Sequence, residues 1–265
     1  MVSSERLTIV TLNTWKNDGD YPRRLALMAG QLAALAPDLV VLQEVFAAPE
    51  VGAHTGDALA AALAMDQIHE AARPGRRRHG DGAVESTSGL SLLSRIPIES
   101  YQRLELPADS DGERIAIAAW TEWNGGRIAI VNLHLTYRPD AHALRRRQLT
   151  NVVESLAGRA AADAIVLAGD FNAEPDAPPL IWLRESSGFS VSDAWDAAGG
   201  PHPTMTEPPG GTIIGSRCID HILLLQPPGK PVATFIAAER VLDRPDAGIL
   251  PSDHAGLRAV LSWTL

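Results

Sequence analysis

The segment LAGDFNAEP (residues 167–175) ends an apolar run with an acid and an amide, Asp170 and Asn172. In a β-strand, residues i and i+2 point to the same face about 6.5–7 Å apart, so both side chains could face one ligand. Asp, Asn, Gly and Pro are also the residues of turns, and one such pair alone would indicate a turn. A phosphate site is favoured only if the same arrangement recurs elsewhere in the chain.

Polar residues also lie at the ends of five other apolar segments. They are Asn13 after LTIVTL, Glu44 after LVVLQ, Asn132 and His134 in IAIVNLH, Asp220 and His221 in CIDHILLL, and Asp253 and His254 before AGLRAVL. Each of them alone favours a turn or a structural histidine. Six such ends together supply nearly every group needed to hydrolyse a phosphate ester, and we therefore expect them to form one site.

The residue types fit attack of water on phosphorus. This reaction needs a cation for the developing charge, a carboxylate to orient the water, and hydrogen-bond donors around the phosphate. Oxygen ligands such as Glu44 and Asn13 suit Mg²⁺, which keeps several waters of its own. The mixed histidine and carboxylate set could also hold Mn²⁺ or Zn²⁺, but thiolate ligands and the close histidine spacings of zinc sites are missing. We expect Mg²⁺, with Mn²⁺ as a substitute.

Composition limits the partners. The 265 residues are 45% hydrophobic and 21% charged, and the formal net charge of −9 disfavours long contact with a nucleic-acid backbone, although a local basic groove stays compatible with it. A single cysteine, Cys218, excludes an internal disulfide framework and suits a reducing compartment. The first residues lack a secretion signal, and no apolar run could span a membrane. We expect a cytoplasmic protein without an integral membrane segment or an evident obligate protein partner.

Short runs rich in Val, Ile and Leu recur along the chain, and several are apolar on both faces, which predicts sheets covered on both sides. Two segments show helical spacing instead. Their apolar faces are Leu25, Met28, Leu32 and Leu35 in the first and Leu149, Val152, Val153 and Leu156 in the second. Asp20 and Asp140 are the expected N-caps, and Pro37 should end the first helix. Residues 73–89, 199–217 and 242–253 are expected to be long loops around the site.

The ordered motifs resemble those of the endonuclease/exonuclease/phosphatase superfamily, which includes pancreatic deoxyribonuclease, abasic-site endonucleases, neutral sphingomyelinases and inositol-polyphosphate 5-phosphatases. The motifs are LNTW, LQEV, GLSLLSRIPI, NLHL, GDFNAEPD, IDHI and SDH, in this order over nearly the whole chain. The resemblance implies an α/β (α+β) fold. This fold would be a four-layer α/β/β/α sandwich of two packed mixed sheets flanked by helices, with the site at one edge. We expect a single such domain over residues 1–265.

The resemblance also implies metal and water roles. Asn13 and Glu44 are similar to the metal-binding pair, with Glu44 the principal ligand, and Asp253 would reach the metal directly or through water. Asp170 is similar to the carboxylate that orients or deprotonates the water. Asn172 would hold a phosphoryl oxygen.

The remaining site residues follow from the same resemblance. His254 is similar to the histidine that contacts the scissile phosphate, with Asp220 as its carboxylate partner, since a carboxylate fixes the imidazole tautomer. His134 is similar to a transition-state donor or leaving-group acid, and Asn132, on the same strand face, is a candidate substrate contact. Either Asp170 or His254 could take the proton from water.

Other polar residues have structural interpretations. His221 stands where many relatives carry Tyr, so we expect it to pack rather than react. Arg145 and Gln148 share one helix face and should support the fold. The run GRRRH, with Arg76, Arg77 and Arg78, lies in an expected loop and could either bind a second phosphate or head group or remain solvated.

We therefore expect a Mg²⁺-dependent phosphodiesterase or phosphatase that hydrolyses a phosphorylated small molecule or lipid head group. A nuclease acting on DNA or RNA is the alternative, since several branches of the superfamily cleave nucleic acid. A catalytically silent binding protein is disfavoured, because Glu44, Asp170, Asn172 and His254 all carry the expected residue.

Overall fold

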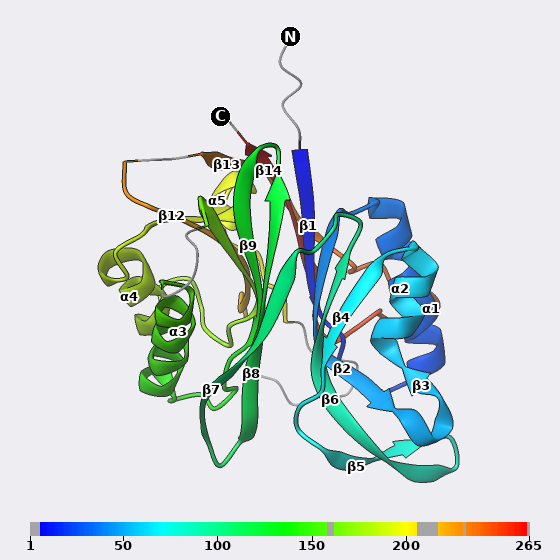
Figure 1. Ribbon diagram of the computed structural model, residues 1–265. Helices are drawn as coiled ribbons and strands as arrows, with labels where there is room; N and C mark the ends of the chain where they lie inside the picture. Colours follow the sequence, from blue (N-terminus) through cyan, green and yellow to red (C-terminus); the bar gives the residue numbers. More distant parts are fainter. Residues whose placement is uncertain (1–5, 158–161, 206–216, 230–231, 264–265) are drawn as a thin grey trace.

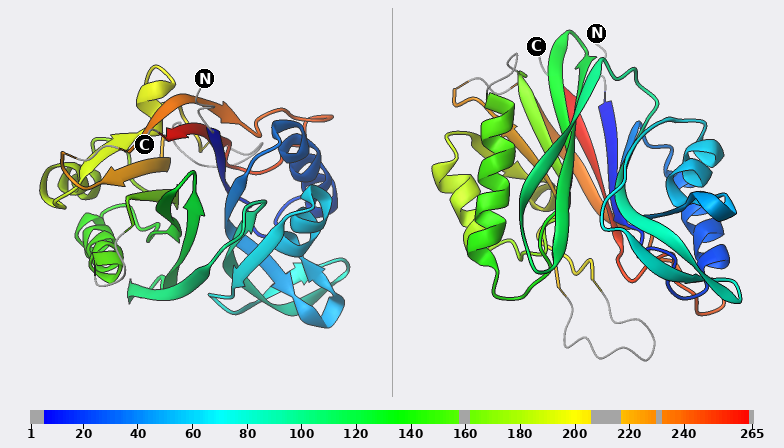
Figure 2. Two further views of the ribbon diagram at one scale, coloured as in Figure 1. Left: turned by 45° about the horizontal axis from the view of Figure 1, so that its top comes forward. Right: turned by 60° about the horizontal axis from the view of Figure 1, so that its bottom comes forward.

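Two β-sheets pack face to face and helices cover their outer faces (Figures 1 and 2). The structure is a computed structural model, and it describes residues 6–157, 162–205, 217–229 and 232–263. Helices α1 and α2 lie on the outer face of one sheet, and α3 and α4 lie on the outer face of the other. The expected four-layer α/β/β/α sandwich is confirmed.

The first sheet has eight strands in the described ranges, in the order β13–β14–β1–β2–β6–β4, with β3 paired to β2 and β5 paired to β6. Its strands are β1 (Arg6–Asn13), β2 (Leu39–Ala48), β3 (Ala53–His54), β4 (Asp66–Glu70), β5 (Gly75–His79), β6 (Gly82–Ser94), β13 (Ala233–Val241) and β14 (Gly256–Trp263). The sheet is mixed, because β1 runs parallel to β2 and antiparallel to β14.

The second sheet has six strands over the same described ranges, in the order β11–β12–β10–β9–β8–β7. They are β7 (Ser100–Asp109), β8 (Gly112–Trp123), β9 (Gly126–His134), β10 (Ala164–Asp170), β11 (Ser190–Asp193) and β12 (Asp220–Gln226). The central strands β10 and β12 are buried along their whole length, as expected of strands covered on both faces.

The helices that the structure describes are α1 (Tyr21–Leu35), η1 (Pro49–Val51), α2 (Thr55–Leu63), α3 (His142–Ala157), α4 (Pro178–Ser186) and α5 (Ala194–Ala197). Asp20 caps α1 by accepting from the Arg23 amide, and the helix ends at a left-handed Ala36 just before Pro37, as predicted. Asp140 is not the cap of α3, because this helix begins two residues later, at His142. No helix in the described ranges is long and apolar enough to cross a membrane.

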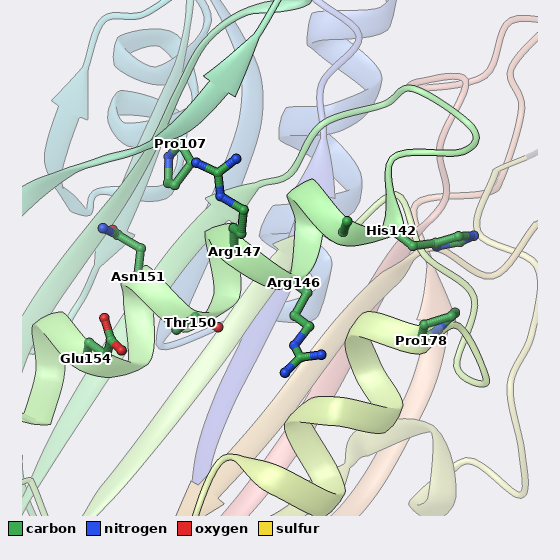
Figure 3. A pocket seen from close by; sticks show the side chains of 9 residues that line it. Pro107, His142, Arg146, Arg147, Thr150, Asn151, Glu154 and Pro178 are labelled. Carbon is green, nitrogen blue, oxygen red and sulfur yellow. The ribbon is translucent and has the colours of Figure 1, made fainter.

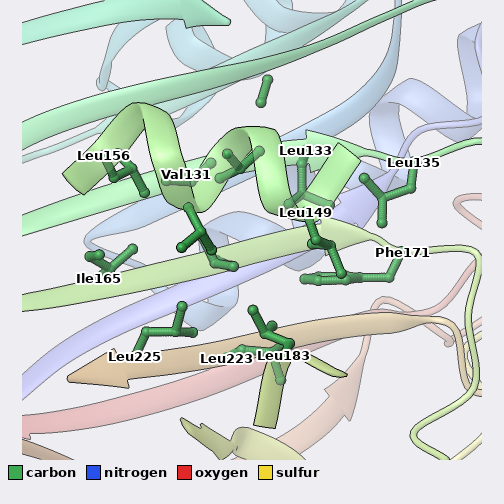
Figure 4. Packing of buried hydrophobic residues seen from close by; sticks show 14 of the residues in the cluster. Val131, Leu133, Leu135, Leu149, Leu156, Ile165, Phe171, Leu183, Leu223 and Leu225 are labelled. Atoms are coloured by element: carbon green, nitrogen blue, oxygen red, sulfur yellow. The ribbon is translucent and has the colours of Figure 1, made fainter. Parts of the chain in front are cut away.

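Three apolar interfaces separate the four layers. One packs α1 and α2 on the first sheet, and another packs the predicted face of α3, which includes Leu149 and Leu156, on the second sheet (Figure 4). The third lies between the sheets and contains Ile9, Ile130 and Val166. Since alternate residues of a strand face opposite ways, each central strand contributes to two interfaces.

One expected loop is a β-hairpin. Residues 75–79 and 82–94 form β5 and β6, so GRRRH lies on a strand and the expectation of a loop over residues 73–89 was wrong. Arg76 and Arg78 share the exposed face of β5, and Arg77 points the other way. The sequence of this segment favours an irregular conformation, because glycines (Gly75 and Gly80) lie on both sides of the three arginines. Pairing with the long strand β6 nevertheless stabilises it as a strand. Residues 242–253 are irregular as predicted, and the expected loop at residues 199–217 lies partly outside the described residues.

Asn132 joins the two sheets and does not face a ligand space. The side chain is fully buried, its amide donates to the carbonyls of Leu42 (2.9 Å) and Ser91 (2.8 Å), and its oxygen accepts from Gln43 (2.8 Å). These protein partners use the amide N–H groups and one oxygen lone pair. The expected substrate contact at Asn132 is therefore not supported, and the residue acts as a structural bridge between β9 and the first sheet.

We expect Asn132→Leu to lower the free energy of unfolding by about 2–4 kcal/mol, because the partners of the amide lose their hydrogen bonds inside the core. Urea unfolding monitored by fluorescence measures the change. Asn151→Leu, on the partly exposed side of α3, is the control and should change stability little. A fully stable Asn132→Leu protein with weakened substrate binding would restore the substrate role.

Candidate active site

The candidate catalytic groups form the polar end of the inter-sheet interface. On β9, β10 and β12, the face that carries Ile130, Val166 and Ile222 continues to a polar residue at the strand end. These polar residues are His134, Asp170 and Asp220. The strand register places Asp170 directly beside both of the others. Strand pairing thus brings residues that are distant in the sequence to one end of the inter-sheet interface.

The close approach of β9 and β10 requires a glycine next to Asp170. Gly169 has a φ of +146°, and a Cβ atom there would lie 2.0 Å from the carbonyl oxygen of Leu133. No other residue fits this position without moving the strand. Gly169 therefore fixes the height of the Asp170 carboxylate relative to His134.

Asp170 is the centre of the site. Its Oδ2 accepts from Asn13 Nδ2 at 3.1 Å and lies 3.4 Å from His134 Nε2 and 4.0 Å from His254 Nε2. Its Oδ1 accepts from the backbone N–H of Asn172 at 2.8 Å. Burial and the neighbouring charge of Asp220 raise the pKa of Asp170 to about 6, against the opposing effect of His254. This carboxylate is ionised at neutral pH and basic enough to accept a proton.

His254 and Asp220 form an ion pair, as expected. The His254 Nδ1 lies 2.8 Å from Asp220 Oδ2, and its Nε2 faces Asp170. Burial lowers the pKa of His254, but the charge and hydrogen bond of Asp220, with Asp170 and Asp253, raise it to about 10. His254 is therefore an imidazolium donor at neutral pH, which makes Asp170 the better candidate for the general base.

His134 is neutral. Burial lowers the pKa of His134 far below its ordinary value, and the positive charges of Arg114 and Arg73 lower it further. Its Nδ1 lies 3.4 Å from Arg73 Nη2, which leaves Nε2 to carry the proton towards Asp170. Of the two expected roles, this geometry favours a neutral hydrogen-bond donor over a leaving-group acid, which would need to be protonated.

Asn172 turns back towards Asp170 in a left-handed conformation, with a φ of +50°. Its side-chain amide donates to the Leu135 carbonyl at 3.2 Å, so the residue ties the end of β10 to the segment after β9. The side chain is 6% exposed. Asn172 thus lies beside Asp170, and its side-chain nitrogen is committed to a protein carbonyl.

The expected metal ligands lie at the same end of the first sheet. Asn13 is the last residue of β1 and Glu44 lies within the parallel strand β2, where a β-bulge at Gln43 and Glu44 accompanies a φ of +53° at Glu44. Bulges and left-handed residues of this kind re-aim side chains at functional sites. Ser252, next to Asp253, donates to the Asn13 carbonyl at 2.6 Å, which brings the third expected ligand to this end.

The charges around Glu44 fit a cation site. Its carboxylate lies 3.3 Å from Lys16 Nζ and 3.7 Å from Arg73 Nη2. Burial would raise the pKa of Glu44, but Lys16, Arg73 and His254 outweigh it and hold the pKa below its ordinary value. Burial raises the pKa of Asp253, and the charge of Glu44 raises it further, a repulsion that a divalent cation between the two would relieve. The oxygen donors suit Mg²⁺.

Asp170, Asp220 and His254 also offer ligand atoms that could hold a metal ion, and these atoms lie within 4.8 Å of one another. We favour the Glu44 side as the metal site, because the 2.8 Å contact of His254 with Asp220 holds a proton. A protonated imidazole has no free lone pair for a metal. Asp220 Oδ1 is buried without a partner among the described residues, so an unoccupied acceptor remains at this end of the site.

Three cationic residues of the site had no sequence signal that we recognised. Lys16 and Arg73 contact Glu44, and Arg114 lies beside His134. Arg114 is 2% exposed, donates to Asp111 at 2.9 Å and lies over the Tyr137 ring, while its Nε and Nη1 lack hydrogen-bond partners among the residues described. Arg73 and Arg114 come from outside the motifs, so only the pairing of strands brings them here.

Arg145, Gln148 and His221, which the sequence predicts to be structural, fix segments next to the site. Arg145 donates to the carbonyls of Thr136 and Pro139, and Gln148 accepts from the Thr136 amide, which fixes the segment after His134. His221 lies on the opposite face of β12 from Asp220 and pairs with Asp193 at 3.2 Å. The structural interpretation of these residues is confirmed.

A surface groove along α3 is separate from this site (Figure 3). It is lined by residues such as His142, Arg147 and Glu154, and the Arg146 guanidinium lies 5.5 Å from the Trp182 ring. None of its lining residues is one of the candidate site residues at the strand ends. On the helix segment LRRRQ (residues 144–148), Arg145 is therefore a buried support, whereas Arg146 and Arg147 are exposed and line the groove.

Comparison with known proteins finds a family model that the chain matches. A family model described as Endonuclease/Exonuclease/phosphatase family matches residues 10–254. No curated protein matches the sequence.

Several solved structures share the fold. The human Nocturnin catalytic domain with a bound sulfate anion is 22% identical with a TM-score of 0.74, and the match covers 98% of this chain and 95% of that one. D. rerio TDP2 complexed with a single-strand DNA product is 18% identical, with a TM-score of 0.75 and coverage of 97% and 99%. An endonuclease/exonuclease/phosphatase from Bacteroides vulgatus is 20% identical, with a TM-score of 0.75 and coverage of 98% and 99%. At these identities the likeness concerns the fold.

We expect Asp170→Asn to stabilise the metal-free protein at pH 8 by about 1–3 kcal/mol. The folded-state pKa of about 6 exceeds the ordinary value of 3.8, so folding favours the protonated acid. This contribution is present below pH 3.8 and lost as the pH rises through 6, which leaves a buried charge that costs stability at pH 8. The asparagine removes that cost.

Urea unfolding at pH 8 and pH 4, in the presence of a chelator, measures the effect. The difference between wild type and variant should nearly vanish at pH 4, where Asp170 is largely protonated. Asp176→Asn, at an exposed position, should be neutral at both values. A variant less stable than wild type at pH 8 would contradict the assignment.

Proposed function

Because the chain belongs to the Endonuclease/Exonuclease/phosphatase family, we propose that it is a divalent-metal-dependent phosphoesterase. The observation that carries this proposal is the convergence on Asp170 Oδ2 of Asn13 Nδ2 and the two histidine Nε2 atoms within 4.0 Å. An ionised base surrounded by donors at one end of a sheet interface suits attack of water on a phosphate. The site draws on both sheets, so we further propose that residues 1–265 act as a single domain.

The protein groups divide the work of the reaction. Asp170 orients the water and takes its proton, and the His254 imidazolium donates to the phosphoryl group while Asp220 holds its ring. His134 donates as a neutral imidazole beside Asp170. Arg73 and Arg114 add fixed positive charge next to it, where charge develops on the phosphoryl oxygens.

The first sheet would supply the metal ligands. Glu44 is the proposed principal ligand, with Asn13 and, directly or through water, Asp253. When bound there, Mg²⁺ or Mn²⁺ would neutralise charge on the phosphoryl and leaving oxygens.

We propose a phosphorylated small molecule or lipid head group as the substrate, either a diester or a monoester. The net charge of −9 supports this choice, because an acidic protein repels a long polyanion outside a local groove. Around the site, cations come mainly from Lys16, Arg73 and Arg114, which is enough for one or two anionic groups. No protein partner is required by this mechanism.

Nuclease activity is the second candidate, and β5 favours it. Arg76 and Arg78 lie on the exposed face of this strand, and the Arg78 carbonyl accepts from Asn17, one residue from Lys16. A basic strand edge beside the site could hold a nucleic-acid backbone. The fold-related TDP2 was solved with a single-strand DNA product.

We expect hydrolysis of an aryl phosphate diester to require added Mg²⁺ and to stop with a chelator. Asp170→Asn and His254→Ala should each lower kcat by about 10²–10⁴, because each removes a group that transfers or donates a proton. The metal-free pKa values predict a rate that rises through pH 6, as Asp170 ionises, and falls through pH 10, as His254 loses its proton.

The matched control for both variants is Asp176→Asn, which should keep wild-type kcat. Equal rates for wild type, Asp170→Asn and His254→Ala would refute these residue roles. An unchanged rate in the chelator would refute the metal.

Nucleic acid separates the two substrate classes. With plasmid, single-stranded DNA and RNA, we expect cleavage far below the rate on small diesters, and the Arg76→Gln/Arg78→Gln variant should keep its activity on the diester. Strong cleavage that weakens with salt and with this double variant would instead support the nuclease, because phosphate contacts release counterions.

A further inference from the structure

The chain uses lysine sparingly, and one lysine lies at the metal end of the site. Of 23 Lys and Arg residues, only Lys16 and Lys230 are lysines. Lysine carries a compact charge on a flexible stem, whereas arginine is a rigid fork suited to permanent pairing. At the position of Lys16, the sequence therefore places the cation that exchanges partners most easily.

Lys16 is shared between two carboxylates. Its Nζ lies 3.3 Å from Glu44 Oε2 and 3.1 Å from Asp18 Oδ2. The Glu44 side chain is 15% exposed and the Asp18 side chain is 50% exposed, so one partner faces the site and the other faces solvent. A small rotation of the lysine stem would leave it paired with Asp18 alone.

The loop that aims Lys16 is held in a strained shape. Trp15 and Lys16 have successive positive φ values of 53° and 44°, which are uncommon outside glycine. The buried Arg24 guanidinium donates to the carbonyls of this loop and to Pro251, at 2.9–3.1 Å; the loop carbonyls belong to Thr14, Trp15, Lys16 and Asp18. Such strain persists only where the surroundings impose it, so the position of Lys16 is built into the fold.

We propose that Lys16 is a displaceable counter-ion of Glu44, so that a divalent cation enters by exchange with the ammonium group. This inference rests on the proposed metal site at Glu44. In the metal-free protein Lys16 and Arg73 neutralise the carboxylate, and the entering metal takes over Glu44 while Lys16 stays with Asp18. Because the metal must displace an ion pair, its binding is weaker and more reversible than at an unpaired carboxylate.

Lysine acylation tests the exchange directly. Metal-free protein and protein saturated with Mg²⁺ are treated briefly with an amine-reactive acylating reagent, and the two lysines are quantified by mass spectrometry. We expect Mg²⁺ to raise acylation of Lys16 at least threefold, because the ammonium loses its partner inside the site. Lys230, the other lysine, is the internal reference, and Lys16 acylation unchanged relative to it would overturn the proposal.

Calorimetric titration with Mg²⁺ tests the energetic consequence. We expect Lys16→Met to bind Mg²⁺ at least tenfold more tightly than wild type, and Lys16→Arg to bind it no more tightly. Arg23→Met, which removes an exposed cation from α1, should bind like wild type. Metal-free Lys16→Met should also melt at a lower temperature than wild type, and Mg²⁺ should close that gap.

Glu44→Gln separates the inference from the function on which it rests. If this variant loses Mg²⁺ binding while Lys16→Met binds like wild type, the exchange is wrong and the metal site stands. If Glu44→Gln binds like wild type, the metal site is wrong and the exchange falls with it. Should Lys16→Met not fold, Lys16→Gln and the acylation of wild-type protein give the same decision.

Discussion

The buried carboxylate of Asp170 is the constraint on which the rest of the site depends. A charge in this position costs free energy unless donors surround it, and the protein surrounds it from both sheets: Asn13 from one, and His134 from the other, with His254 beyond. The same burial that threatens stability gives the acid a pKa near neutrality. Burial of Asp170 is therefore the cause both of its raised pKa and of its cost in stability, as at many functional sites with shifted pKa values.

Much of this arrangement follows from the sequence. Apolar runs that end in a polar residue, read with a two-residue period, predict which side chains face the inter-sheet space. The segment Asp220, His221, Ile222 illustrates this period, because Asp220 and Ile222 face the inter-sheet space while His221 faces the other way and pairs with Asp193. The helices were predictable too, since their apolar spacing and the cap at Asp20 act locally.

What escaped prediction depends on pairing between distant strands. Asn132 lies on the same strand and the same strand face as His134. Its side-chain amide is nevertheless fully hydrogen-bonded, and the partners come from the opposite sheet. The hairpin of β5 and β6 has weak local propensity and gains its order from a long neighbouring strand. Arg114 reaches the site because of strand register, which no local pattern encodes. The bulge that turns Glu44 is likewise a property of the β2–β6 pair.

The site draws side chains from two facing sheets, so the thickness of the apolar layer between the sheets affects the distances between these side chains. Small side chains such as Ala119, Ala168 and Ala259 line this layer and set how closely the sheets approach. A well-packed interior transmits strain rather than absorbing it. A single methyl group added in this layer would therefore lengthen the distance between Asn13 and Asp170, which lie on opposite sheets. For the proposed reaction, the packing of this layer would therefore influence the rate from positions that no substrate contacts.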